Sequence, residues 1–137
     1  MNKPTLLFIS IGELATHLLE AVARTDIFST IIVASRDINK AQKRVNNALL
    51  GAGIEGYFPQ IIAEDLDVHS NDFSTKLRNI NPDYIFSAPS LFPWWKLPPS
   101  NIHIPFAGYT ALHLSLMQTF RNQIAKANID AFWIGAS

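Results

Sequence analysis

The residues best suited to bind a ligand lie in a short turn near the amino terminus, between an apolar run and a helical pattern. The turn reads Ser10-Ile11-Gly12-Glu13-Leu14-Ala15, which is S-x-G-x-x-A. In the dinucleotide-binding spacing G-x-G-x-x-G/A, the first glycine makes a tight turn, the second lets the backbone approach a pyrophosphate, and the third position packs the helix on the strand. Gly12 and Ala15 match this pattern, and Ser10 departs from it. Glu13 suits the positive end of a helix, but its carboxylate must point away from a phosphate. An ordinary strand-to-helix turn is the alternative.

A basic cluster follows the second apolar run, at a position that distinguishes nucleotide ligands. NAD enzymes usually place an acidic residue there to bind the ribose hydroxyls, whereas this chain has Ser35-Arg36. The guanidinium of Arg36 can bind a phosphate through two hydrogen bonds. Lys40 and Arg44 follow at helical spacing, with Lys43 adjacent. This pattern favours NADP(H) over NAD(H) and argues against a methyltransferase. A solvated basic helix face is the alternative for the three helix residues.

Two further strand ends carry candidate cofactor contacts. After the third apolar run, an acidic side chain next to an apolar one could flank an adenine; an acidic loop that caps the next helix is the alternative. After the fourth, small residues could let the backbone approach a ribose and pyrophosphate; a proline that only ends the strand is the alternative. The candidates are Asp67 and Val68, or Asp65 and Leu66 if the register differs, and then Ser87, Ala88 and Pro89.

The catalytic residues stay open. Tyr109, Thr110 and His113 begin a long helical pattern and could line a nicotinamide, because histidine exchanges protons near neutral pH; a packed helix start is the alternative. His113 holds the i+4 position where a short-chain dehydrogenase tyrosine requires lysine, which argues against that mechanism. His69 could touch a cofactor, or it is a plain loop histidine. The sequence has no metal-binding histidine spacing, no nucleophile elbow and no P-loop, so we predict no metal.

Strand and helix patterns alternate along the chain, which predicts a doubly wound parallel α/β sheet with right-handed connections. Continuous apolar runs without a polar face are typical of strands covered on both sides. The expected strands are Thr5–Ile11, Ser29–Ser35, Tyr57–Ala63, Asp83–Ala88 and Ala131–Gly135, and the expected helices are Glu13–Arg24, Asp37–Leu50, Asn71–Asn79 and Thr110–Ala127.

Local signals set the boundaries of these elements. Asp37 is a suitable N-cap for the second helix, and Gly51 and Gly53 are expected near its end, where left-handed residues are favoured. The proline-rich segment Pro89–Pro105 reads as an irregular connection that includes a short strand at Ile102–Phe106. Its adjacent tryptophans, Trp94 and Trp95, suggest an interface or substrate lid, with a flap over the sheet edge as the alternative.

Composition excludes several classes of protein. Eleven basic residues balance eleven acidic ones, so the basic excess typical of nucleic-acid binding is absent. There is no cysteine, hence no disulfide and no thiolate chemistry. Charged residues make up 16%, against about 25% in average soluble domains. No apolar run approaches the roughly 20 residues that cross a bilayer, and no signal peptide is evident. We therefore expect a cytoplasmic domain with no nucleic-acid or membrane partner.

Four segments together resemble the N-terminal NADP-binding domain of saccharopine dehydrogenase-like reductases: LLFISIGELATHLLEAVA, IIVASRDINKAQ, EDLDV and YIFSAPS. Other extended and short-chain reductases have nearly the same pattern. The resemblance covers Thr5 to Ser90 and implies a Rossmann-like three-layer fold and hydride transfer to an imine or carbonyl. It assigns Gly12 and Ala15 to the phosphate turn, Ser35 and Arg36 to a 2′-phosphate site, and Asp67 and Val68 to the adenine edge.

Reductases of this kind carry the substrate pocket and most catalytic groups on a second domain. We therefore expect residues 1–137 to form one cofactor domain of a larger two-domain protein, with a natural single-domain protein as the alternative. The resemblance implies a small-molecule substrate bound through that second domain, and a homo-oligomer. The alternative function is a non-catalytic nucleotide sensor or scaffold, for which the departure at Ser10 is the main argument.

Overall fold

The computed structural model describes residues 2–89 and 105–136, and Trp94 and Trp95 lie outside this part of the chain. Strands and helices alternate as the sequence predicts. The strands are β1 (Thr5–Ile9), β2 (Thr30–Ser35), β3 (Ile61–Asp65), β4 (Tyr84–Ser87) and β5 (Phe132–Gly135). The helices are α1 (Glu13–Val22), α2 (Ile38–Ile54), α3 (Phe73–Ile80), the short 3₁₀ helix η2 (Phe106–Tyr109) and α4 (Thr110–Ala127).

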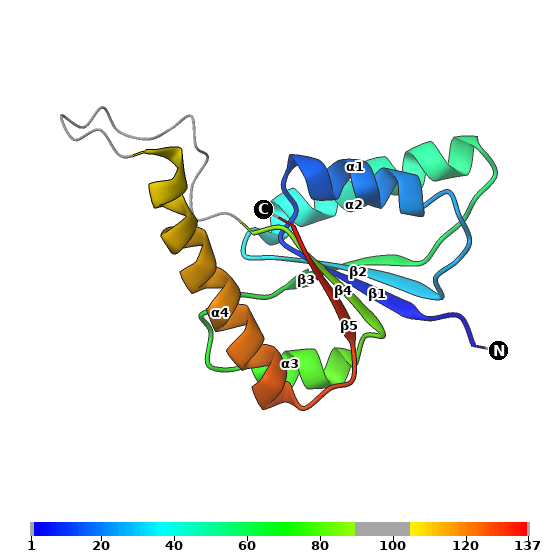
Figure 1. The fold of residues 1–137 in the computed structure, drawn as a ribbon. Coiled ribbons are helices and arrows are strands. Elements are labelled where there is room, and N and C mark those ends of the chain that lie inside the picture. Colours follow the sequence, from blue (N-terminus) through cyan, green and yellow to red (C-terminus); the bar gives the residue numbers. More distant parts are fainter. Residues whose placement is uncertain (1, 90–104, 137) are drawn as a thin grey trace.

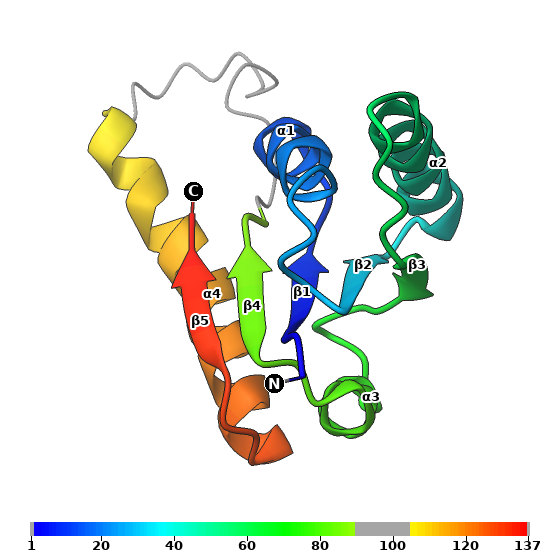
Figure 2. The same cartoon turned by 90° about the vertical axis from the view of Figure 1, so that its right-hand side faces the viewer.

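The five strands form one parallel sheet in the order β3-β2-β1-β4-β5. Helices α1 and α2 cover one face of the sheet, and α3 and α4 cover the other (Figure 1). The chain runs outward from β1 to β3 and then returns to place β4 on the other side of β1 (Figure 2). This confirms the predicted doubly wound, three-layer α/β architecture. In such sheets ligands bind beyond the carboxyl ends of the strands, where the strand order reverses, which here lies between β1 and β4.

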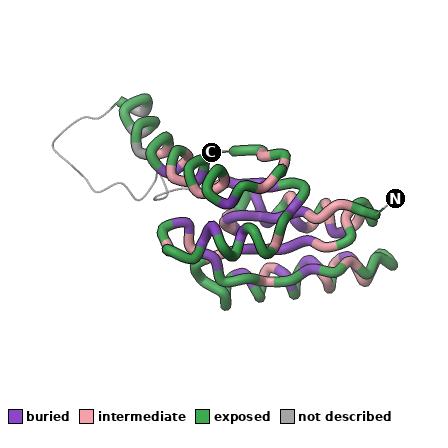
Figure 3. The backbone as a smooth tube through the Cα atoms, turned by 90° about the horizontal axis from the view of Figure 1, so that it is seen from below, coloured by how far each residue is buried: buried purple, intermediate pink, exposed green. Residues whose placement is uncertain are grey.

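Two apolar layers hold the sheet between its helices. Alternate strand residues face opposite sides, so Phe8 and Val33 pack under α1 and α2, whereas Leu7 and Ile85 pack against α3 and α4. Figure 3 shows the buried strands between helices whose outer sides are exposed. Among the α4 side chains whose burial is described, few are buried. Phe120 is the largest of them, and its ring meets that of Phe73 edge-on. None of the described helices has the length and hydropathy needed to cross a bilayer.

Two strand boundaries differ from the prediction. The first strand ends at Ile9 and not at Ile11, because Ser10 has a φ of 72°, which is incompatible with an extended strand. Ile11 extends the apolar run because it is buried in the core beneath α1 and α2. The third strand begins at Ile61, four residues later than predicted, and continues to Asp65. Burial explains the shift, because Phe58 is exposed and Ile61 is the first buried side chain.

The predicted end of the second helix is also wrong. Helix α2 continues through Gly51 and Gly53 to Ile54, and the left-handed residue is Gly56, with a φ of 84°. The helix continues because Ala52 is fully buried in the core. A side chain at Gly51 would meet the guanidinium of Arg24, so this glycine leaves room for that arginine beside α2 and does not end the helix.

The remaining boundaries agree within two residues. Asp37 is the N-cap of α2, and its carboxylate accepts a hydrogen bond from the backbone N–H of Lys40 at 3.0 Å, as predicted. Most of the strand proposed at Ile102–Phe106 lies outside the described residues. Its last residue, Phe106, begins η2 and is not in a strand.

Candidate functional site

The β1–α1 turn keeps the geometry of a glycine-rich turn although its first residue is serine. Ser10 takes the left-handed conformation that glycine adopts at no steric cost. Its backbone N–H donates to the Ala34 carbonyl at 2.9 Å, which ties the turn to β2. Gly12 is the N-cap of α1, and both the N–H and the hydroxyl of Thr16 bond to its carbonyl, at 3.0 and 2.6 Å. Ala15 is fully buried, so it packs the helix on the sheet as the spacing predicted.

Gly12 is not explained by the conformation or packing of the chain. Its φ of −81° and ψ of −166° are in the extended region, which any residue can adopt. A Cβ built on Gly12 has no described atom within 4 Å. Glu13 and Leu14 follow and are both exposed. The open space at Gly12 lies at the amino end of α1, where free N–H groups and the helix dipole favour an anion.

The end of β2 presents a cation beside this turn. Ser35 is the last residue of the strand, and its hydroxyl accepts a hydrogen bond from the Asp37 N–H at 3.2 Å. Arg36 is exposed, and within the described part of the chain no carboxylate pairs with its guanidinium. Lys40 and Lys43 are exposed on the first turns of α2, and Arg44 is half-buried. The predicted basic cluster therefore lies at the carboxyl edge of the sheet, with Arg36 nearest the strand end.

Ile38 is a residue at this edge that the sequence reasoning missed. It is the first residue of α2 and is 38% exposed, although the apolar residues of this helix otherwise point to the core at this end. An apolar side chain at a helix start two residues after Arg36 was the available signal. An exposed isoleucine there can pack against the flat face of a ligand ring.

The structure separates the adenine-edge candidates into exposed and buried ones. Leu66 and Val68 are buried in the core with α3 and α4, so their side chains do not face the carboxyl edge. Asp65 is the last residue of β3, is exposed, and is paired in register with Ser35. Asp67 is half-buried, and its carboxylate accepts the His69 N–H at 3.0 Å. Of the adenine-edge candidates, Asp65 is therefore the one with an exposed carboxylate beside the end of β2.

The end of β4 is closed by an aromatic residue from the neighbouring strand. Ser87 is fully buried, and its hydroxyl accepts a hydrogen bond from the indole N–H of Trp133 at 2.6 Å. The Ser87 side chain therefore points to Trp133, on the face of the sheet that α3 and α4 cover. Ala88 and Pro89 are half-buried at the same edge, which leaves these two as the residues of the fourth strand end that a ligand can reach.

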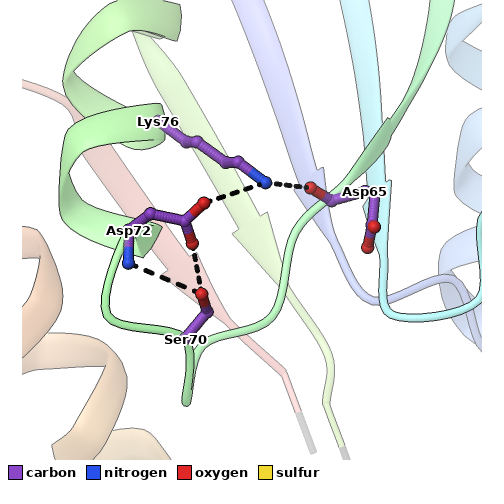
Figure 4. A network of polar contacts seen from close by, with 4 residues as sticks. All are labelled: Asp65, Ser70, Asp72 and Lys76. Atoms are coloured by element: carbon purple, nitrogen blue, oxygen red, sulfur yellow. Dashed lines mark hydrogen bonds and ion pairs between the residues drawn. The ribbon is translucent and has the colours of Figure 1, made fainter.

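A polar network joins α3 to the end of β3 (Figure 4). The ammonium of Lys76 lies 3.3 Å from the Asp72 carboxylate and donates to the Asp65 carbonyl at 3.2 Å. Asp72 also accepts a short hydrogen bond from the Ser70 hydroxyl. The Ser70 hydroxyl first, and Lys76 second, stabilise the ionised form and hold the pKa of Asp72 below its ordinary value. This network was not predicted, because Lys76 and Asp65 are eleven residues apart on different elements.

The proposed catalytic candidates are not brought together with the turn by any described contact. Thr110 begins α4, as predicted, and is exposed, and His113 lies half-buried one turn further on. Tyr109 ends η2. His69 is exposed on the loop after β3. Among the described residues, no three histidine, cysteine or acidic side chains are grouped as metal ligands.

Comparison with known proteins identifies the fold. No protein-family model and no curated protein matches the sequence. Among solved structures, a lactate dehydrogenase from a Medee basin deep-sea metagenome library aligns over 100% of this chain and 38% of its own, with a TM-score of 0.73 and 10% identity. A lactate dehydrogenase from Eimeria maxima, solved with NADH and oxamate, aligns over 98% and 36%, with a TM-score of 0.70 and 10% identity.

A third similar structure belongs to another group of dehydrogenases. The bulky-bulky ketone specific alcohol dehydrogenase from Comamonas testosteroni covers 93% of this chain and 50% of its own, with a TM-score of 0.58 and 10% identity. The chain thus shares its fold with a part of each of these dehydrogenases, and it spans 36–50% of the length of these three neighbours. A saccharopine dehydrogenase-like relationship is not among these findings.

Proposed function

We propose that this chain is an NADP(H)-binding Rossmann domain of an oxidoreductase. The pyrophosphate would lie over Gly12 at the amino end of α1, and the adenosine 2′-phosphate would be bound by Arg36, with Lys40 beside it. Similar folds in dehydrogenases support the general placement. The cofactor, when bound, supplies the hydride; the residues of this chain bind and orient it.

The observation that carries this proposal is the open space at Gly12. Gly12 is the N-cap of α1, where serine, threonine, asparagine or aspartate would add a side-chain cap that glycine lacks, and neither a positive φ nor a tight contact with described atoms requires glycine there. A ligand that approaches the backbone closely would explain the missing side chain. The guanidinium of Arg36 at the adjacent strand end pairs with no carboxylate in residues 2–89 and 105–136, which supports a second anionic group on the same ligand.

The experiment is a calorimetric titration of the protein with NADPH and NADH, using Gly12→Ala and Arg36→Ala. Gly12→Ala should still fold, with a loss of up to about 1 kcal/mol because alanine is a poorer N-cap than glycine, yet bind both nucleotides more weakly because its methyl group occupies the phosphate space. Arg36→Ala should raise the dissociation constant for NADPH about tenfold, as expected for one charge-assisted contact, and leave that for NADH nearly unchanged. Wild-type protein that binds neither nucleotide would overturn the proposal.

We further propose that the substrate is an imine or carbonyl compound, as the resemblance to saccharopine dehydrogenase-like reductases suggests. The substrate pocket would come from a second domain, and the assembly would be a homo-oligomer. The test is NADPH oxidation by the longest form of the protein against a panel of imines and ketones. Tight binding of NADPH without turnover of any of them would favour a nucleotide sensor.

A further inference from the structure

Lys76 connects two segments that the sequence separates. It lies on the second turn of α3, and its ammonium bridges the Asp72 carboxylate at the start of that helix and the Asp65 carbonyl at the end of β3 (Figure 4). The Asp65 carboxylate itself points away from this ammonium (Figure 4). The lysine thus holds the backbone of the strand end and not its side chain.

The peptide unit that Lys76 holds is fixed on both sides. Its carbonyl, from Asp65, accepts the Lys76 ammonium at 3.2 Å, and its N–H, from Leu66, donates to the Ser35 carbonyl at 3.2 Å. Ser35 directly precedes Arg36. A continuous chain of hydrogen bonds therefore runs from α3, through the end of β3, to the backbone at which Arg36 leaves β2.

We propose that Lys76 is a positioning residue for Arg36. By fixing the peptide between Asp65 and Leu66, it orders the Ser35 carbonyl and the direction in which the Arg36 side chain leaves the sheet. This inference rests on the proposed function, in which Arg36 binds the 2′-phosphate of NADP(H). Lys76 then contributes to the preference for NADP(H) without touching the ligand.

The exposure of Lys76 separates this role from a stabilising one. Its side chain is 45% exposed and that of Asp72 is 54% exposed, and ion pairs this accessible contribute little to folding stability. Replacement of Lys76 should therefore leave the fold intact while it loosens the strand end. Lys3 offers a matched control, because its side chain is 47% exposed and is paired with Asp26, at the amino-terminal edge of the sheet away from Arg36.

The experiment compares dissociation constants for NADPH and NADH in wild type, Lys76→Met, Lys76→Arg and Lys3→Met. Lys76→Met should lower the preference for NADPH over NADH about three- to tenfold, the range set by one ordering hydrogen bond. Lys76→Arg should restore most of the preference, and Lys3→Met should not change it. A thermal melt of each variant shows whether the fold is retained.

A double-mutant cycle tests the route. If Lys76 acts through Arg36, then adding Lys76→Met to Arg36→Ala should change NADPH affinity less than about twofold, because coupled residues are not additive. An unchanged preference in Lys76→Met, or full additivity in the double variant, would overturn this inference and leave the proposed function standing. Wild-type protein that binds neither nucleotide would remove the proposed function and this inference together.

Discussion

Replacement of Ser10 by glycine should stabilise the protein. Four described non-glycine residues have a positive φ, and three of them are asparagine or aspartate, which tolerate the left-handed region better than other residues. Ser10 is the exception, with a φ of 72°. A non-glycine residue in this conformation costs roughly 1–2 kcal/mol of folding stability. Glycine costs about 0.4–1 kcal/mol of folding stability for a different reason, because it has more conformations to lose from the unfolded chain.

The difference between these terms predicts a gain of roughly 0.5–1 kcal/mol for Ser10→Gly. No described partner of the Ser10 hydroxyl would be lost, and the N–H bond to Ala34 does not depend on the side chain. For a domain of this size the gain corresponds to a rise in Tm of about 2–4 °C. Urea and thermal unfolding of wild type and variant measure it.

Two control variants test whether backbone strain at Ser10 is the cause of the gain. Ser10→Ala keeps a Cβ at the left-handed position and should show no comparable gain. Gly56→Ala introduces a Cβ where φ is 84° and the surroundings are open, so it should lose stability through conformation alone. If Ser10→Gly is destabilising, or if Ser10→Ala stabilises equally, strain at this turn is not the reason.

Three further predictions test the packing of the layers. Arg78→Ala should lower the unfolding free energy by about 1–2 kcal/mol, because its guanidinium donates to two carbonyls at the end of α4, at 2.9 and 3.1 Å; urea unfolding measures this. Phe120→Ala should cost about 3–5 kcal/mol, since this ring is 1% exposed and is the largest buried contact of α4; loss of helical circular dichroism at lower urea would show it. Asp72→Asn should lower the folding stability only at pH values above the carboxylate's pKa. The folded-state pKa is lowered by Ser70 and Lys76, so the stabilisation is present above about pH 4 and disappears as the pH falls through the folded value. Melting temperatures of both proteins should therefore converge toward low pH; a constant difference would contradict the assignment.

The sequence predicted the order of elements because each buried strand is a continuous apolar run and each long helix has apolar residues at helical spacing. The strand ends were less predictable. Ile11 and Tyr57 are apolar, but Ile11 packs beyond a turn and Tyr57 precedes its strand, and apolar character alone cannot separate these cases. Gly51 was misread as a helix end because its reason is a contact with Arg24, which lies far away in the sequence.

In the candidate site, too, some residues were predictable from the sequence and others were not. The turn at Gly12 and the cation at Arg36 were predicted, since both follow directly from a strand end. The side chain of Val68 was expected to face an adenine, but it is buried with residues of α3 and α4. Ser87 was predicted only as a small residue that lets a ligand approach the backbone, and its hydroxyl accepts a hydrogen bond from Trp133 that the sequence did not indicate. Lys76 had no local signal, because its partner carbonyl is defined only once β3 ends beside α3.

Ser10 and Gly12 depart from what the fold alone would favour, and they do so in opposite directions. Conformation would favour glycine at position 10, where φ is positive, and helix capping would favour a side chain such as serine at position 12, where the backbone is extended and the space is open. The hydrogen bond from the Ser10 N–H to the Ala34 carbonyl stabilises the strained turn, so the turn does not need a ligand to form. Glycine at position 12 leaves α1 without a side-chain cap, and no contact in the described chain explains that choice. A phosphate group that binds close to the backbone would explain the glycine. Gly12→Ala, and not Ser10→Gly, is therefore the substitution that should weaken nucleotide binding while the protein still folds.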